Sequence, residues 1–243
     1  SETFQNKNFL TLKIKDAIVD NIRKKFGLFP ADVEDRIDRN MRNYFKNKGL
    51  NWSWYLKFTK RLRYSGACIA GSFVLSAFSK TSKGQELNHQ KWNPDDVDIY
   101  VNYKNGAKFI SKIKKYFKQH NFALDILKPT IPDDYDHSFF IKNKILWLVR
   151  IRVYKKAQPY NELKFKMDIM FTEEEPVKVI SNFDLTFCQI LFNGKNILAT
   201  HIDHIYNKTG TLNKDYIQTY LNGNAFLKNR ISNLKGEEKG WPF

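Results

Sequence analysis

Two segments of this sequence, Ile69-Ala70-Gly71-Ser72 and Asp96-Val97-Asp98-Ile99-Tyr100-Val101, decide the predicted fold. The first is a short apolar run that ends in a Gly-Ser turn and leads into the apolar stretch Phe73 to Phe78, a pattern typical of a strand followed by a helix. The second alternates polar and apolar residues, as a strand with one buried face does. A strand, a turn, a helix and another strand predict an α+β fold with a mixed sheet flanked by helices.

Three aspartates occupy polar positions of predicted strands. Asp96 and Asp98 project from one strand face about 7 Å apart, because side chains alternate between faces at roughly 3.3 Å per residue. Asp168 lies in a later predicted strand, Leu163 to Phe171, on the same face as Lys166. Neighbouring carboxylates repel one another unless a cation neutralises them, and hard divalent cations such as Mg²⁺ or Mn²⁺ prefer carboxylate oxygens. The pattern therefore favours a metal site formed by all three aspartates, a set that suits two-metal phosphoryl transfer.

Each aspartate also has a simpler interpretation. Asp-x-Asp occurs often in turns, and a single aspartate in a strand can pair with a basic neighbour, here Lys166 or Arg152. The order of the segments and the apolar residues around each aspartate favour the metal site over these alternatives.

The Gly71-Ser72 turn supplies a second part of the predicted site. A glycine at a strand-to-helix turn lets the backbone approach a phosphate closely, and the start of the following helix presents N–H groups. The Ser72 hydroxyl adds one more donor. Together with the aspartates, this turn predicts a site for a triphosphate and its metal ions.

The order Gly-Ser, Asp-x-Asp and a later Asp resembles the DNA polymerase β-like nucleotidyltransferase superfamily over about residues 65–171. This resemblance implies a nucleotidyltransferase-type sheet, Mg²⁺ or Mn²⁺ as cofactor and an NTP as substrate. It implies that Asp96, Asp98 and Asp168 are the catalytic residues and metal ligands, and that Gly71 and Ser72 hold the triphosphate. The favoured reaction, by resemblance to poly(A) polymerases, adds a nucleoside monophosphate to an RNA 3′-hydroxyl.

The stretch from Phe183 to His201 resembles uncharacterised proteins of this type from large DNA viruses. A viral origin would place the protein in the virion or in the host cytoplasm.

The periodicity divides the chain into three segments. Residues 1–64 read as a helical segment, with apolar stripes that predict helices over residues 9–22, 33–44 and 52–63. In the third of these helices we expect an inward-facing stripe formed by Trp52, Tyr55, Phe58 and Leu62. Residues 65–175 form the predicted catalytic core, and residues 176–243 form a mixed or helical C-terminal segment.

Charge favours a polyanionic partner. The 243 residues include 41 Lys and Arg against 25 Asp and Glu, a net charge of +16. Such an excess, spread along the chain, favours RNA or single-stranded nucleic acid as a ligand. The candidate contact residues are Lys112, Lys115, Arg61 and Arg63, although solvated helix faces explain them equally well. A protein partner or a homo-oligomer stays open.

Cysteine content and hydropathy restrict the cellular compartment in which we expect the protein. Two cysteines, Cys68 and Cys188, exclude a disulfide-dense scaffold and favour a reducing, cytoplasmic location. No run of apolar residues is long enough for a membrane span, so we expect no membrane association.

Two other functions compete with RNA-directed transfer. One is an inactive RNA-binding or scaffold subunit that keeps the fold, and the other is a transferase that modifies a protein or a small acceptor. The net charge of +16 disfavours the second alternative, because such acceptors need no long basic groove.

Overall fold

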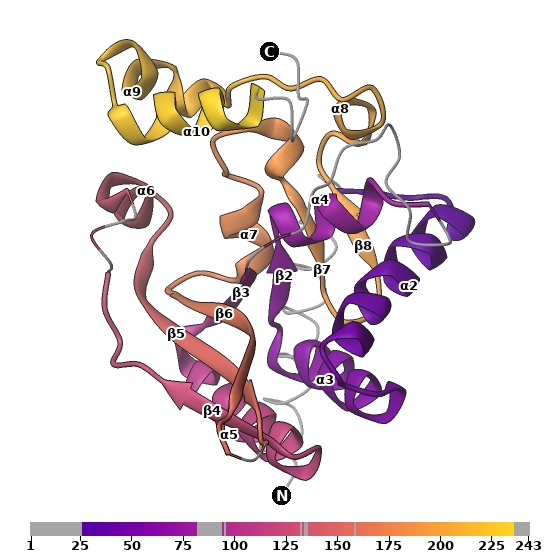
Figure 1. Cartoon of the computed structure of the whole chain (residues 1–243). Coiled ribbons are helices and arrows are strands. Elements are labelled where there is room, and N and C mark those ends of the chain that lie inside the picture. Colours follow the sequence, from indigo (N-terminus) through magenta and orange to yellow (C-terminus); the bar gives the residue numbers. More distant parts are fainter. Residues whose placement is uncertain are drawn as a thin grey trace, which may run out of the picture.

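The fold is seen in a computed structural model that describes residues 26–81, 94, 96–131, 133, 136–157 and 159–235. The helix predicted over residues 9–22 lies outside these residues. Within them, helices flank one eight-stranded sheet with the strand order β1-β8-β7-β2-β3-β6-β5-β4 (Figure 1). The predicted α+β fold with a mixed sheet flanked by helices is confirmed.

Strands from distant parts of the chain build this sheet. The β3–β6 pair is parallel, and the other neighbouring pairs of described strands are antiparallel. The strands are β1 (Gly27–Leu28), β2 (Cys68–Ala70), β3 (Asp96–Asn102), β4 (Phe122–Ile126), β5 (Ile145–Lys155), β6 (Glu162–Thr172), β7 (Ile190–Phe192) and β8 (Ile197–Ala199). One sheet therefore contains strands from each of the three segments that the periodicity distinguished.

The helices follow the apolar stripes of the sequence closely. They are α2 (Ala31–Asn47), α3 (Trp52–Ser65), α4 (Ser72–Phe78), α5 (Tyr103–Gln119), α6 (His137–Lys142), α7 (Pro176–Ile180), α8 (Ile202–Tyr206), α9 (Ile217–Leu221) and α10 (Ala225–Lys235). Helix α5 begins directly after β3 because the Asn102 side chain accepts a hydrogen bond from the Lys104 backbone and caps the first turn. Among the described helices, none is both long and apolar enough to cross a membrane.

The central strands β3 and β6 have two different faces. One face carries Val97, Ile99 and Val101 of β3, which are fully buried. Helix α5 packs on this face so closely that a Cβ added to Gly106 would overlap the Phe171 ring. The three predicted aspartates occupy alternate positions in the same strands, so their side chains leave the opposite face. The aspartate face is covered further along the strands, where Tyr100 and Met170 are buried, and its first residues in β3 are the half-buried Asp96 and Asp98 of the candidate site.

Helices α2 and α3 extend the apolar layer on the same face as α5. Phe45 of α2 packs against Phe58 of α3 and Phe165 of β6, with ring centroids 5.7 Å apart in both pairs. The expectation that Trp52 points inward is wrong, because its side chain is 49% exposed while Trp54 is fully buried. The buried stripe runs through Trp54, and a residue two positions earlier lies about 200° away around the helix.

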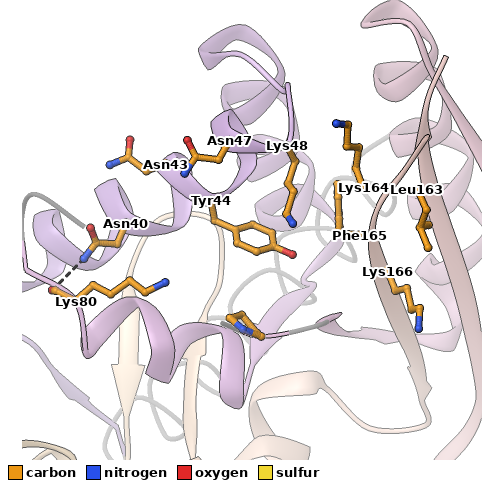
Figure 2. A pocket seen from close by; sticks show the side chains of 11 residues that line it. Asn40, Asn43, Tyr44, Asn47, Lys48, Lys80, Leu163, Lys164, Phe165 and Lys166 are labelled. Carbon is orange, nitrogen blue, oxygen red and sulfur yellow. Dashed lines mark hydrogen bonds between the residues drawn. The ribbon is translucent and has the colours of Figure 1, made fainter. Parts of the chain in front are cut away.

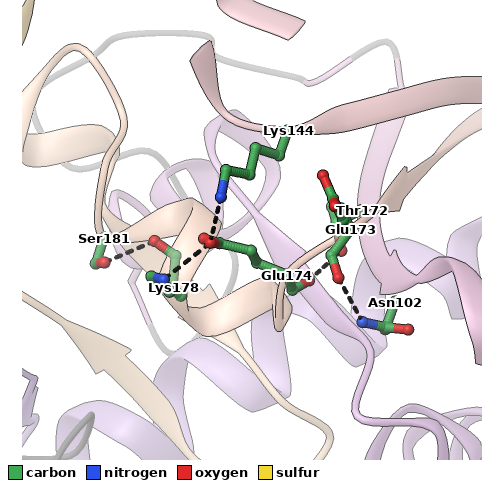
Figure 3. Close-up of polar contacts among 7 residues, drawn as sticks. All are labelled: Asn102, Lys144, Thr172, Glu173, Glu174, Lys178 and Ser181. Carbon is green, nitrogen blue, oxygen red and sulfur yellow. Dashed lines mark hydrogen bonds and ion pairs between the residues drawn. The ribbon is translucent and has the colours of Figure 1, made fainter. Parts of the chain in front are cut away.

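Polar contacts at the far ends of β3 and β6 fasten the sheet to α7 (Figure 3). The Asn102 side chain donates a hydrogen bond of 3.1 Å to the Glu173 carbonyl. The Glu174 carboxylate accepts hydrogen bonds from Lys144 at 2.8 Å and from Lys178 at 2.9 Å. These two hydrogen bonds lower the pKa of Glu174. The contacts join the end of β6 to the start of β5 and to α7.

Replacing Gly106 with alanine is expected to destabilise the protein, because the added methyl group collides with the Phe171 ring. Overpacking of this kind costs about 1–3 kcal/mol. Chemical denaturation of the variant should show this loss. A second measurement in a Phe171→Leu background should show a smaller effect of the same change, since leucine leaves room for the methyl group. Equal losses in both backgrounds would contradict the packing described here.

The Glu174→Gln variant should be less stable than the wild type only above the carboxyl's usual pKa of 4.5. A lowered folded-state pKa stabilises the fold above the unfolded-state pKa, and this stabilisation disappears as the pH falls through the folded-state pKa. Because the lysines are exposed, we expect at most about 1 kcal/mol, a shift of roughly 2–4 °C. Melting curves between pH 7 and pH 3 should converge; a constant difference would contradict this role of the carboxylate.

Candidate active site

The three predicted aspartates meet at adjacent positions of β3 and β6. In the parallel register of these strands Asp98 stands beside Asp168, and Asp96 stands beside Lys166. One carboxylate oxygen from each of Asp96, Asp98 and Asp168 lies within 4.8 Å of the others. Residues that are 70 positions apart in the sequence are thus in contact range, as the strand alternation predicted.

The third aspartate is held by an arginine that the sequence analysis did not consider. Asp168 is fully buried and accepts two hydrogen bonds of 2.9 Å from Arg150 of β5, one at each carboxylate oxygen. Arg150 is its register partner in the antiparallel β5–β6 pair. Arg152, one of the two partners considered from sequence, instead lies 3.5 Å from Asp125 of β4. The bidentate pair fixes the orientation of the Asp168 carboxylate.

The donor set of this cluster fits a hard divalent cation. Asp96 and Asp98 are half-buried, whereas Asp168 is fully buried on the inner side of the cluster. Arg150 offsets part of the negative charge through its two hydrogen bonds to Asp168. Carboxylate oxygens keep further lone pairs when each accepts one hydrogen bond, so Asp168 retains the capacity to contact an ion. Mg²⁺ and Mn²⁺ prefer such oxygen ligands.

The Gly71-Ser72 turn lies beside the same end of β3. Antiparallel pairing of Ile69 with Ile99 makes the chain leave β2 next to the first residues of β3. Gly71 has φ 69° and ψ −137°, a backbone conformation that side chains other than glycine rarely adopt. Ser72 then begins α4 and is half-buried. The turn is therefore positioned next to the aspartates, as the sequence predicted.

The predicted nucleic-acid contacts lie on the other side of the sheet. Lys112 and Lys115 belong to α5, and Arg61 and Arg63 belong to α3. Both helices pack on the face opposite the aspartates. Lys115 and Arg63 are exposed, whereas Lys112 and Arg61 are half-buried. A strand of nucleic acid bound to these helices would be held away from the carboxylates.

A polar cavity of about 580 Å³ lies between α2 and β6, and we refer to it as the α2–β6 pocket (Figure 2). Its lining residues, mostly amide and lysine side chains, are Asn40, Asn43, Tyr44, Asn47, Lys48, Lys80, Pro94, Leu163, Lys164, Phe165 and Lys166. The sequence analysis missed it, although three asparagines at helical spacing in α2 are a visible signal. Pro94 precedes Asp96 by two residues and Lys166 precedes Asp168 by two, so the pocket adjoins the strand ends that carry the aspartates.

The chain matches a known protein family. The family model described as Gabija anti-defense 2 family protein matches residues 35–208, well over half of the chain. The chain belongs to the Gabija anti-defense 2 family. No curated protein matches the sequence. Residues 35–208 of the chain include the three aspartates, the Gly71-Ser72 turn and the residues that line the α2–β6 pocket.

Membership in the Gabija anti-defense 2 family corrects the family predicted from the sequence. The assignment to the DNA polymerase β-like nucleotidyltransferase superfamily, with a poly(A) polymerase-like or viral relative, is wrong, because the matching family model is a different one. The Gly-Ser turn and the three aspartates are residue types that phosphate and metal binding require in many folds. Such a pattern describes a kind of site and does not by itself identify a family.

Mg²⁺ or Mn²⁺ should raise the melting temperature of the wild-type protein and not that of the Asp96→Asn/Asp98→Asn double variant. A ligand at 100 times its Kd stabilises the fold by about 2.7 kcal/mol, which corresponds to several degrees for a domain of this size. Without metal, the double variant should melt no lower than the wild type, since it removes two like charges from the cluster. Differential scanning calorimetry measures both effects.

Asp125→Asn is the matched control, because this aspartate is exposed and pairs with Arg152. It should keep the full metal-dependent shift. An equal shift in the double variant would mean that the cations bind elsewhere.

Proposed function

We propose that this protein is a divalent-metal-dependent nucleotidyltransferase that moves a nucleoside monophosphate from an NTP to an acceptor hydroxyl. The observation that carries the proposal is the convergence of Asp96, Asp98 and Asp168 within 4.8 Å on adjacent parallel strands. A site with three carboxylates and a nearby glycine turn is suited to bind a nucleotide whose phosphates are coordinated by divalent cations. The name of the family further suggests that the reaction opposes Gabija defence.

Each part of the site has a task in this reaction. Asp96 and Asp98 would hold the cations, and the Gly71 backbone and the Ser72 hydroxyl would bind the triphosphate. When bound, the cations neutralise the phosphates and stabilise the charge on the transferring phosphoryl group. Arg150 would act as a positioning residue, because its two hydrogen bonds keep the Asp168 carboxylate turned toward the other two aspartates.

The reaction exchanges a phosphoanhydride bond of the NTP for a phosphoester bond to the acceptor. The acceptor oxygen forms a bond to the α-phosphorus, and the bond from that phosphorus to the oxygen bridging the β-phosphate breaks. Pyrophosphate leaves, and the hydroxyl proton passes to the carboxylate cluster, where Asp168 is the fixed member. The three carboxylates would thus both bind the cations and accept the proton of the acceptor hydroxyl.

The net charge and the burial of the cysteines support a proposed binding partner and a proposed cellular compartment. The net charge of +16 supports a negatively charged partner such as RNA, and the exposed lysines of α5 offer a surface for it. Cys68 and Cys188 are both buried thiols, which suits a protein that acts in a reducing cytoplasm. Burial also raises the pKa of the Cys68 thiol to about 12, so this cysteine is not a reactive group.

Asp98→Asn should reduce nucleotidyl transfer by on the order of 10²-fold or more, since it removes a charge that the transition state needs. The purified protein is incubated with each labelled NTP, with Mg²⁺ or Mn²⁺, and with RNA or mononucleotides as acceptors. Products are separated on gels and by chromatography. Asp125→Asn serves again as the control and should retain wild-type transfer.

The same variants connect the chemistry to the family name. In cells that carry Gabija, wild-type protein and Asp125→Asn should lower the level of defence, whereas Asp98→Asn should not. Full anti-defence activity of Asp98→Asn, together with an absence of transfer in every assay, would support the noncatalytic scaffold instead.

A further inference from the structure

The lining of the α2–β6 pocket favours an anionic ligand. Lys48, Lys80, Lys164 and Lys166 contribute to it, and among the described residues no aspartate or glutamate does. Lys164 contacts Glu162 at 2.6 Å, and Lys48 lies 5.2 Å from the centre of the Tyr44 ring. Lysine binds phosphate as a point charge, so several lysines around one small cavity favour a phosphorylated ligand.

The opposite wall of the pocket offers groups that can recognise a nucleobase. Asn40, Asn43 and Asn47 of α2 are spaced three and four residues apart, which places them on one helix face. An amide both donates and accepts hydrogen bonds, as the edge of a base does. The half-buried Tyr44 ring stands between these amides and β6, with its centroid 4.9 Å from that of Phe73 and 6.1 Å from that of Phe165 (Figure 2).

Asn40 gives independent evidence that a ligand belongs here. Its side chain is 5% exposed, and its Nδ2 donates to the carbonyls of Ala77 at 3.0 Å and Lys80 at 3.1 Å. These bonds fix which end of the amide is nitrogen, so the other end must be an acceptor. That acceptor, Oδ1, is buried without a hydrogen-bond partner. A buried acceptor without a hydrogen-bond partner is unfavourable, and a donor on a bound ligand would satisfy it.

The lining of the pocket includes residues of both faces of β6, with Phe165 on the face that α2 covers and Lys166 on the aspartate face. Lys166 is the register partner of Asp96 and leaves the same face of the sheet as Asp168. The Gly71-Ser72 turn, which would hold the triphosphate of the donor, lies on the β2 side of β3. The carboxylates therefore separate two places where substrates could bind.

We propose that the α2–β6 pocket binds the acceptor, and that the acceptor is a phosphorylated nucleoside of mononucleotide size. This inference rests on the proposed nucleotidyl transfer. Lysines bind the phosphate of the acceptor, and the amides of Asn40 and Asn43 form hydrogen bonds with its base. A hydroxyl of this nucleotide forms the new bond to the α-phosphorus while pyrophosphate leaves. The cavity volume of about 580 Å³ is that of a small-molecule site and not of a groove for a long strand.

Binding in the absence of metal tests the pocket without relying on catalysis. Calorimetric titration with nucleoside monophosphates, in a chelating buffer, is performed on the wild type, on Lys48→Ala/Lys166→Ala and on Asn43→Ala. The double lysine variant should bind at least about tenfold more weakly, a loss of 1.4 kcal/mol. Asn43→Ala should weaken nucleoside monophosphates and leave the binding of inorganic phosphate unchanged. Lys57→Ala/Lys60→Ala on α3 is the matched control, because both lysines are exposed and lie outside the pocket lining, and it should bind as the wild type does.

The Asp98→Asn variant should also bind the monophosphates as the wild type does. The pocket can therefore be tested independently of whether the protein catalyses nucleotidyl transfer. If the protein catalyses transfer, the Lys48→Ala/Lys166→Ala variant should show a higher KM for the acceptor nucleotide than the wild type in transfer assays. Its KM for the donor NTP should be unchanged. A rise in the donor KM instead would overturn the acceptor assignment. Undiminished binding in both pocket variants would overturn the site itself, even if transfer is observed, and so would transfer confined to long RNA. Inorganic phosphate that binds as tightly as a nucleotide would overturn base recognition.

Discussion

The candidate site depends on one constraint, the parallel pairing of β3 with β6 in a register that puts Asp98 beside Asp168. Three carboxylates at this distance repel one another, and the sheet tolerates them through the bidentate contact of Arg150 with Asp168. The parallel pair in turn requires a long connection, which α5, β4, α6 and β5 provide. Within this connection β5 is essential to the site, because it brings Arg150 into register with Asp168. The geometry of the candidate site therefore follows from the topology of the sheet.

Much of the central fold follows from local patterns. Alternation from Asp96 onward predicted both a strand and the shared face of two aspartates, and the apolar stripes predicted α3 and α5. The hydrogen-bond partner of Asp168, in contrast, could not be predicted from local patterns. Arg150 and Arg152 alternate with apolar residues on the same face of β5, and only the β5–β6 register selects Arg150. Register is set by long-range packing, and a shift by two residues would preserve every local preference.

The α2–β6 pocket shows the same limit of local patterns. An amphipathic helix at α2 was predicted, and its buried residues Ile37, Met41 and Phe45 form the expected stripe. Nothing local indicates that the asparagines beside this stripe face a strand more than 100 residues later. Similarly, β1 and β8 pair although they come from opposite parts of the chain. Contacts between such distant segments depend on the whole sheet, whereas periodicity describes one element at a time.

The two faces of the central strands also explain how basic residues and carboxylates share one small protein. Apolar residues that alternate with the aspartates anchor α2, α3 and α5, so the outer surfaces of α3 and α5 carry the exposed basic side chains away from the cluster. Among the described residues, lysines at the end of α2, in the segment after α4 and in β6 line the α2–β6 pocket, and Arg150 adds its charge directly at Asp168. Part of the positive charge near the site therefore lines a cavity. Such a cavity selects ligands by size as well as by charge, because a long strand cannot be enclosed by it.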